Sequence, residues 1–261
     1  MYRLIKLFLV LSISLLAYSD MDMDGVDDKV DKCPNTPLTE LVDLSGCTIK
    51  KLVSPHHFDI SLGTKYIKGK DVKIDTTSIQ FDYYYKDFSL SLYSSYFSRD
   101  MYNDKDSGVD NTYLNGYYKF KATNRLSFKI GGGVSLPTYD SNNNKLDYTL
   151  SSYINYYYNS FSILGGVGYT VIGDKDTNST IYKNSSFYNI GLGYYFHNIL
   201  YTTLTYNSVS SIYTNSDDIK NISLYNYYKI DKNWFLNLSY THGLNSISMK
   251  RSVGVRVGYY W

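Results

Sequence analysis

A run of aspartates near the start of the sequence has the residue types and the spacing of a calcium-binding loop. Between residues 20 and 31, acids stand at the first, third, fifth, ninth and twelfth positions, and a glycine stands at the sixth. Ca²⁺ takes about six to eight oxygen ligands, and glycine allows the sharp turn that brings in a backbone carbonyl. The spacing therefore predicts Ca²⁺ as a cofactor. The expected ligands are the carboxylates of Asp20, Asp22, Asp24, Asp28 and Asp31 and the carbonyl of Val26.

The same stretch resembles the thrombospondin type-3 calcium repeat. In that repeat, alternating aspartates lead into Cys-Pro, as they do here from Asp20 to Pro34. The continuation to Cys47 is similar to the periplasmic repeat segments that accompany OmpA-like outer-membrane proteins, and the resemblance implies calcium binding. A solvated acidic linker is the alternative, because there is one repeat and Lys29 and Lys32 stand among the acids.

Cys33 and Cys47 are the only cysteines in the sequence. In an exported chain, two cysteines predict a disulfide. Their spacing excludes a Cys-x-x-Cys redox pair, and two further ligands for zinc are missing. The bond would close a loop in a segment too small to have its own core, which contributes about 3 kcal/mol in the chain-entropy model.

The first residues have the features of a secretory signal peptide. Arg3 and Lys6 precede an apolar stretch from Leu7 to Leu16, and cleavage is expected after Ser19. A buried terminal strand or helix is the alternative. We expect three parts: the signal peptide at 1–19, the thrombospondin type-3-like calcium loop with its disulfide at 20–55, and a β-barrel at 56–261.

The composition excludes several classes of protein. Tyrosine accounts for 32 residues, beside 11 Phe and 2 Trp, yet the mean hydropathy is −0.31. No apolar run after residue 16 reaches the ~20 residues of a transmembrane helix, and disordered chains are poor in aromatic residues. The sequence has 26 Lys and Arg against 24 Asp and Glu, with two of the basic residues in the expected signal. The remainder is formally neutral, which argues against a nucleic-acid partner.

The rest of the chain is expected to form β-strands, because apolar and polar residues alternate in about ten-residue segments from residue 58 onward. Twelve such segments are expected, at 58–67, 76–86, 88–98, 111–121, 125–135, 146–158, 161–171, 186–196, 199–208, 220–229, 234–242 and 251–261. Short connections alternate with longer polar ones throughout, which is typical of outer-membrane barrels with tight periplasmic turns and long external loops. The predicted fold is all-β, an antiparallel up-and-down transmembrane β-barrel of 12 strands with a small periplasmic N-terminal calcium-loop segment. A secreted β-sandwich is the alternative.

Aromatic residues at the segment ends predict girdles at the two membrane interfaces. The final residues, Tyr260 and Trp261, resemble the C-terminal β-signal of bacterial outer-membrane proteins. This resemblance implies outer-membrane lipid and the barrel-assembly machinery as partners. It also implies a location in the outer membrane of a Gram-negative bacterium, with the N-terminal segment in the periplasm.

The lumen-facing residues given by the alternation are polar and of mixed charge, and they include Gln80, Asp82, Tyr225 and Asn237. Asp59, Lys129 and Arg256 are the charged lumen candidates. Asp59 and Arg256 are expected to pair where the barrel closes, with solute selectivity as the alternative role of Arg256. Twelve strands lie between small filled barrels and the large aqueous porins.

The predicted function is a porin-like passive channel for small solutes that is not an enzyme, with calcium bound by the acidic repeat. A closed structural or adhesive barrel is the alternative. A barrel lipid hydrolase is disfavoured, because His242 and Ser246 have no acid nearby.

Overall fold

The computed structural model describes residues 20, 22, 25–36, 40–51, 55–102, 104–141, 143–177, 180–196 and 199–261. The chain divides into two compact units, Met1–Pro55 and His56–Trp261. The predicted signal peptide at 1–19 and the predicted ligand Asp24 lie outside the described residues. None of the described residues forms a helix with the length and apolarity that crossing a bilayer requires.

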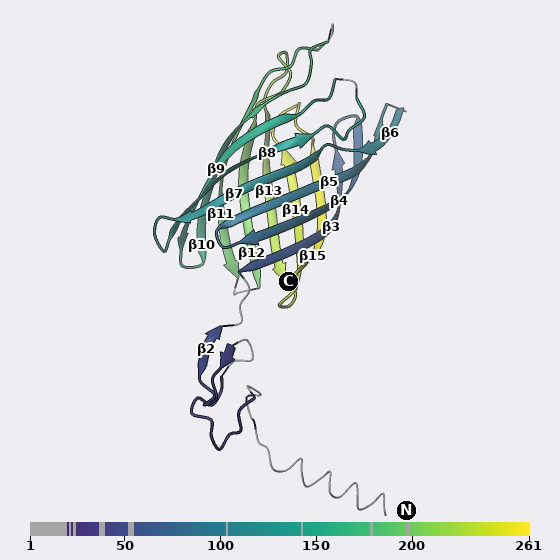
Figure 1. Cartoon of the computed structure of the whole chain (residues 1–261). Coiled ribbons are helices and arrows are strands. Elements are labelled where there is room, and N and C mark those ends of the chain that lie inside the picture. The colour runs from purple at the N-terminus through teal and green to yellow at the C-terminus, as the bar shows by residue number, and fades with distance from the viewer. Residues whose placement is uncertain are drawn as a thin grey trace, which may run out of the picture. The chain divides into compact units, whose positions relative to one another are not determined.

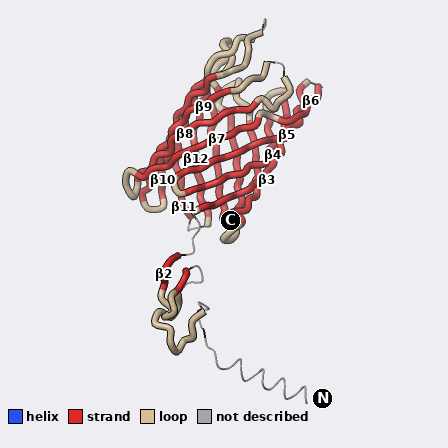
Figure 2. The backbone as a smooth tube through the Cα atoms, viewed as in Figure 1, coloured by secondary structure: helices blue, strands red, loops and turns tan. Residues whose placement is uncertain are grey.

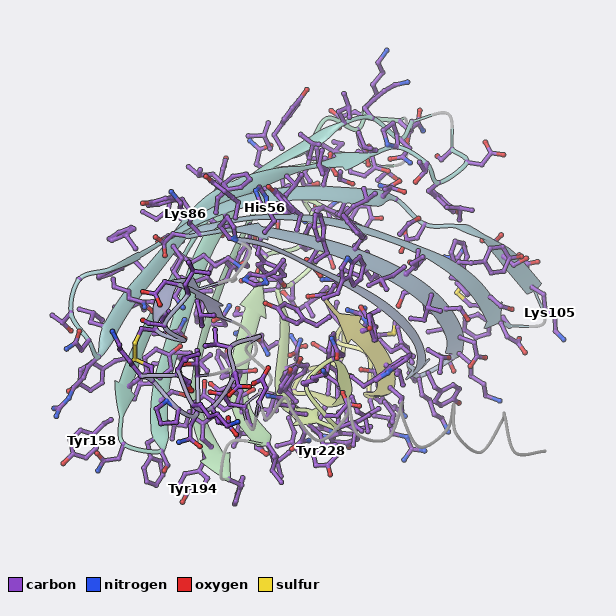
Figure 3. The ribbon with its side chains drawn as sticks, turned by 60° about the horizontal axis from the view of Figure 1, so that its bottom comes forward. His56, Lys86, Lys105, Tyr158, Tyr194 and Tyr228 are labelled. Carbon is purple, nitrogen blue, oxygen red and sulfur yellow. A yellow bond between two sulfur atoms is a disulfide. The ribbon has the colours of Figure 1, made fainter. Side chains whose placement is uncertain are left out.

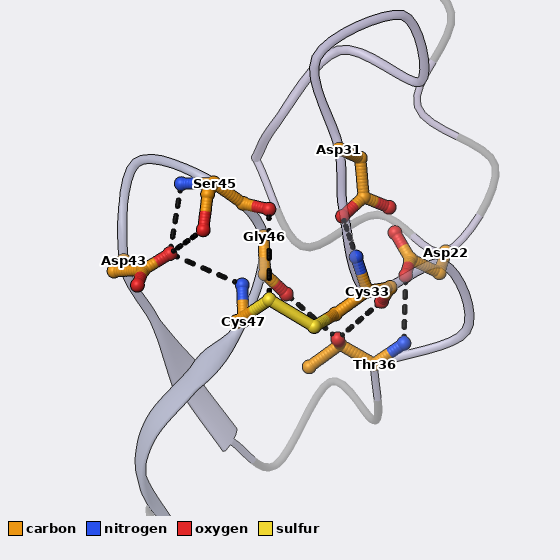
Figure 4. The surroundings of a disulfide bond; sticks show 8 residues. All are labelled: Asp22, Asp31, Cys33, Thr36, Asp43, Ser45, Gly46 and Cys47. Atoms are coloured by element: carbon orange, nitrogen blue, oxygen red, sulfur yellow. Dashed lines mark hydrogen bonds between the residues drawn. A yellow bond between two sulfur atoms is a disulfide. The ribbon is translucent and has the colours of Figure 1, made fainter.

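The N-terminal unit contains a two-stranded antiparallel sheet of β1 (Glu40–Val42) and β2 (Thr48–Lys51), which the sequence reading did not predict. The predicted disulfide between Cys33 and Cys47 is confirmed, with 5.0 Å between the Cα atoms. Hydrogen bonds from the Ser45 hydroxyl and from the N–H groups of Ser45 and Cys47 lower the pKa of Asp43 (Figure 4). The described part of the segment is therefore held by a disulfide, a short sheet and hydrogen-bonded turns.

The second unit is a closed antiparallel barrel of twelve strands (Figures 1 and 2). Each strand pairs with its neighbours along the chain, and β15 pairs with β3 to close the ring. The strands are β3 (His56–Lys68), β4 (Val72–Tyr85), β5 (Phe88–Met101), β7 (Thr112–Lys121), β8 (Leu126–Leu136), β9 (Asp147–Tyr158), β10 (Phe161–Val171), β11 (Ser185–Phe196), β12 (Leu200–Val209), β13 (Ile219–Lys229), β14 (Trp234–Gly243) and β15 (Arg251–Tyr260). The predicted fold class and strand number are confirmed.

Burial in the barrel is reversed relative to a water-soluble domain. Asp59 and Asp82 on the inner face are 8% exposed, whereas Ile190 and Leu192 on the outer face are 60% and 62% exposed. Successive strand residues point to opposite faces. The apolar half of each alternating segment therefore faces outward, as it must if lipid surrounds the barrel.

One end of the barrel has tight turns and a rim of aromatic side chains. Lys86 and Asn159 adopt positive φ angles of 53° and 51° in two-residue connections, as primed hairpin turns require. Tyr158, Tyr194 and Tyr228 lie near the strand ends at this rim (Figure 3). This arrangement fits the predicted interfacial girdle.

Two of the expected long connections are different in the structure. β3 and β4 extend until only residues 69–71 join them, and β5 continues into a hairpin with an additional strand, β6 (Asp104–Val109). β6 stands at the end of the barrel away from the C-terminus, and Lys105 lies on it (Figures 1 and 3). An ion pair between Arg99 and Asp106 joins its two strands. The apolar alternation missed this strand because a polar hairpin outside the membrane has no lipid-facing side.

The barrel is closed by contacts between its first and last strands. The N–H groups of Phe58 and Trp261 each donate to the carbonyl of the other residue at 2.9 Å. Their rings stack with centroids 5.7 Å apart, and Tyr259 contacts Trp261 at 5.9 Å. Trp261 therefore seals the seam in addition to belonging to the aromatic rim.

Candidate functional site

The lumen contains two neighbouring cavities along one wall of the barrel. The larger, of about 540 Å³, lies nearer the tight turns, and the smaller has about 320 Å³. Tyr225, Asn237 and Arg256 line both cavities and therefore form the partition between them. The larger cavity is also lined by Asp59, Ser61, Gln80, Asp82, Tyr84, Tyr227, Phe235 and Tyr260.

Arg256 is fixed at this partition by side chains from β4 and β5. Its Nη1 donates to Oε1 of Gln80 at 2.5 Å, and its Nη2 donates to Ser78 Oγ at 3.4 Å. The guanidinium carbon lies 5.5 Å from the centre of the Tyr93 ring, within the range of a cation–π contact. On β3, Gly63 stands opposite Arg256 and leaves room for the long side chain.

Asp59 lies in the same cavity as Arg256, but the expected ion pair between them is wrong. The register of β15 on β3 places Arg256 opposite Gly63 and Asp59 opposite Tyr260. The two charges are therefore offset along the barrel. Within the described residues no ion pair joins them, and Asp59 accepts a hydrogen bond from Tyr84 at 3.0 Å.

Lys129, the third charged candidate, lies on a different wall. Its Nζ is 4.4 Å from the centre of the Tyr117 ring, and it stands across from Lys119 and Tyr153. The Tyr117 and Tyr153 rings meet edge to face at 6.0 Å, and Phe187 follows at 6.4 Å from Tyr153. This wall is therefore an aromatic surface that carries two lysines, and Asp82 across the lumen is close enough to act electrostatically on Lys129.

Inward aromatic rings lie over inward glycines on the adjacent strand. Four directly paired positions share this pattern: Tyr117 with Gly131, Tyr153 with Gly166, Phe187 with Gly168 and Phe235 with Gly258. A Cβ added at any of these glycines would overlap the partner ring. The glycines let large rings lie against the wall of the lumen, which leaves space in its centre.

In the N-terminal unit, the predicted calcium ligands already organise the backbone. Asp20 accepts a hydrogen bond from the Gly25 N–H at 2.9 Å, where Gly25 has a φ of 93°. Asp22 Oδ2 accepts from the Thr36 N–H at 2.7 Å, and Asp31 accepts from the Cys33 N–H at 2.8 Å (Figure 4). These bonds tie the acidic loop to the disulfide.

Asp22 Oδ1 is buried and has no hydrogen-bond partner. A buried carboxylate oxygen left unpaired is costly, and a cation would satisfy it. Among the described residues no three acids, histidines or cysteines already converge on one point, while Asp24 lies outside them. The donor chemistry fits Ca²⁺, and Asp28 and Val26 remain predicted ligands.

The residues considered for hydrolysis do not form a dyad in the described part of the chain. His242 stands opposite Ile222 and Arg251 on the outward-facing side of β14, and no hydrogen bond joins it to Ser246. This position is suited to an interface residue.

The sequence reading missed four residues that line the larger cavity: Tyr84, Tyr227, Phe235 and the lumen-facing Tyr260. The signal was present, because all four continue the inward half of the alternation to the ends of their strands. An aromatic residue at a strand end can belong to the girdle or to the lumen, and the alternation separates the two because only every second residue faces lipid.

The closed ring, the apolar outer face and the polar lumen define a transmembrane β-barrel. Residues 51–260 match the family described as "Putative MetA-pathway of phenol degradation", and the chain belongs to that family. No curated protein matches the chain.

Two solved structures share the fold. One is the COG4313 outer membrane channel from Pseudomonas putida F1, with a TM-score of 0.63, 9% identity, and coverage of 79% of this chain and 95% of that chain. The other is the NanC porin, with a TM-score of 0.52, 10% identity, and coverage of 77% and 98%.

Proposed function

We propose that this protein is a passive, porin-like channel for small solutes in the outer membrane. The observation that carries the proposal is the pair of cavities inside the barrel, which share a polar wall and a partition formed by three side chains. Polar groups along a narrow passage replace part of the hydration shell of a solute, while the apolar exterior keeps the barrel in lipid. Similarity to barrels that are channels supports the proposal.

Conductance separates this proposal from a closed barrel. Purified full-length protein in planar bilayers should show discrete openings, and liposomes containing it should swell in small solutes. Hydroxybenzoates belong in the solute panel because the family description refers to phenol degradation. Protein that folds, as judged by heat-modifiable gel mobility, but gives neither openings nor swelling would instead be a structural or adhesive barrel. Release of fatty acid from lipid would indicate a hydrolase.

The barrel orientation that we infer places the N-terminal segment in the periplasm. The segment joins β3 at Pro55 and His56, at the end of the barrel with the short turns. In outer-membrane barrels short turns are periplasmic. Tyr260 and Trp261 would then reach the barrel-assembly machinery from the same side.

The second part of the proposal is calcium binding by the thrombospondin type-3-like loop. Asp20, Asp22, Asp24, Asp28 and Asp31 would supply carboxylates, and Val26 its carbonyl. The unpaired, buried Oδ1 of Asp22 supports this assignment, because it is an oxygen placed for a ligand that the protein does not itself provide.

Replacing Asp22 by Asn should weaken calcium binding at least about tenfold, because a charged ligand is lost. Calorimetric titration of the full-length protein in detergent measures the effect. Asp27→Asn is the matched control, because it removes the same charge from the same loop at a position outside the ligand set. Equal losses in both variants, or no calcium heat in the unmodified protein, would leave the loop as an acidic linker.

A further inference from the structure

The larger lumen cavity has two acids facing each other on adjacent strands. Asp59 and Asp82 are direct cross-strand partners on β3 and β4, and each is only 8% exposed. Like charges in such a pair destabilise a sheet. The side chains that donate hydrogen bonds to them are neutral: Tyr84 donates to Asp59 at 3.0 Å, and Gln80 donates to Asp82 at 2.7 Å. The cavity therefore holds negative charge that no described cation neutralises by direct contact.

Arg256 supplies a positive charge to the same cavity at a fixed separation from the acids. The amide of Gln80 lies between them, with its oxygen accepting from Arg256 and its nitrogen donating to Asp82. Ser78 and Tyr93 hold the guanidinium from other sides. Gln80 thus prevents the opposite charges from pairing with each other and keeps both available to a solute.

Aromatic side chains form much of the remaining wall of this cavity. The Tyr227 and Phe235 rings stack at 5.5 Å, and Gly258 lets Phe235 lie against the wall. Tyr225 and Tyr260 add two further rings to the lining, and Ser61 and Asn237 add small polar groups. The space between the charges is therefore suited to the apolar body of a small molecule.

We propose that the larger cavity is a binding subsite for small zwitterions, molecules that carry an ammonium group, a carboxylate and an apolar body. This inference rests on the proposed channel function. The ammonium group would lie at Asp59 and Asp82, and the carboxylate at Arg256. When a solute with both charges enters the cavity, its ammonium group and its carboxylate each exchange water for an oppositely charged protein group. A solute with one charge leaves one of the protein charges uncompensated.

Three solutes of similar shape test this proposal: L-phenylalanine, which carries both charges, 3-phenylpropanoate, which carries only the carboxylate, and 2-phenylethylamine, which carries only the ammonium group. Each is added during single-channel recording of the full-length protein at neutral pH. Interruptions of the current report binding in the lumen. The concentration at which the interruptions reach half of their maximum should be about tenfold lower for phenylalanine than for either singly charged solute. This difference corresponds to one charge-assisted interaction.

Two variants should change this pattern in opposite ways. Arg256→Gln should weaken phenylalanine and 3-phenylpropanoate about tenfold while leaving 2-phenylethylamine unchanged or tighter, and Arg256→Lys should restore part of the loss. Asp82→Asn should weaken phenylalanine and 2-phenylethylamine instead. Matched controls on the same strands are Arg251→Gln and Asp75→Asn, which remove the same charges from exposed positions outside the cavity.

The outcomes separate this inference from the channel proposal. Equal interruption by all three solutes, or an equal response to the cavity and control variants, would overturn the zwitterion subsite while leaving a channel in place. Complete absence of conductance in the unmodified protein would overturn the channel itself. Heat-modifiable gel mobility identifies any variant that fails to fold, and Arg256→Lys and Asp82→Asn then serve as the remaining tests.

Discussion

The lumen-facing glycines determine where the largest rings of the lumen can lie. Phe235 occupies the volume that a side chain on Gly258 would need, and Phe187 does the same at Gly168. Glycine in a strand interior normally weakens a sheet, and it is found where another group approaches closely. Here the packing of the ring over the glycine offsets the cost in strand stability, and it also holds the ring away from the centre of the lumen.

Gly258→Ala should displace Phe235 toward the larger cavity. Overpacking of this kind costs about 1–3 kcal/mol, and the displaced ring should also lower the single-channel conductance. Urea-induced unfolding and bilayer recording measure the two effects. Gly116→Ala is the control, because its Cβ would face outward with the nearest heavy atom 3.7 Å away. If Gly258→Ala matched this control in both measurements, the ring would not be confined by the glycine.

For single residues, the sequence predicted which side of the barrel wall a side chain faces better than it predicted the hydrogen-bond partners of that side chain. Period-two alternation predicted that Asp59, Lys129 and Arg256 face inward, and the register places them there. It could not supply the partners of Arg256, because Gln80 and Ser78 come from a strand about 180 residues earlier and depend on the closure register.

The aromatic contacts at the seam act at the scale of secondary structure elements. Trp261 joins the end of β15 to β3 through two backbone hydrogen bonds and one ring stack, all with Phe58, and its ring also contacts Tyr259 on β15 itself. Trp234 lies in the same girdle but contacts Tyr259 alone among the described ring pairs. The two tryptophans therefore separate the effect of the seam from that of the girdle.

Trp261→Ala should lower the free energy of unfolding by about 1–3 kcal/mol, because each aromatic pair contributes about 0.5–1.5 kcal/mol. Trp234→Ala, with one ring pair, should lower it by about half as much. Urea titration of protein folded into vesicles compares them, and Trp261→Phe should recover most of the loss. A larger loss in Trp234→Ala than in Trp261→Ala would contradict this assignment.

The strand boundaries were predictable wherever lipid dictates the pattern, and not elsewhere. β10 begins and ends at the predicted residues, and most other strands differ from prediction by one or two residues. The exceptions extend beyond the membrane, at the β3–β4 connection and in β6. There strand pairing maintains the strands, and in the β5–β6 hairpin the Arg99–Asp106 ion pair adds to it. In the N-terminal unit, β1 and β2 are too short to show any period.

The molecule as a whole depends on the separation of an apolar exterior from a polar interior. Ile190 and Asn189 are adjacent on β11 but face opposite media: Ile190 is exposed on the outer surface, and Asn189 stands opposite Gly166 and Asn207 in the lumen. The low mean hydropathy of the chain is the average of these two faces, which is why it does not indicate a membrane protein by itself.

Ile190→Lys should therefore destabilise the barrel by about 2–4 kcal/mol, the cost of a lysine facing the middle of the bilayer. Asn189→Lys is the matched control and should change stability by less than about 1 kcal/mol, because the ammonium group of the introduced lysine reaches the water-filled lumen. Urea titration in vesicles measures both. Similar losses in the two variants would indicate that the outer face is not in contact with lipid.

The pairing of β3 with β15 also affects the order in which the barrel strands can pair during folding. All other neighbouring barrel strands are consecutive along the chain and can form as local hairpins, whereas this pair joins segments about 200 residues apart. Non-local contacts form slowly because loop entropy must be overcome first. An open, curved sheet with two unpaired edges should therefore be the long-lived species during insertion. Such edges pair readily with other chains, so the interval before closure is when the protein is most vulnerable to aggregation and most dependent on a chaperone.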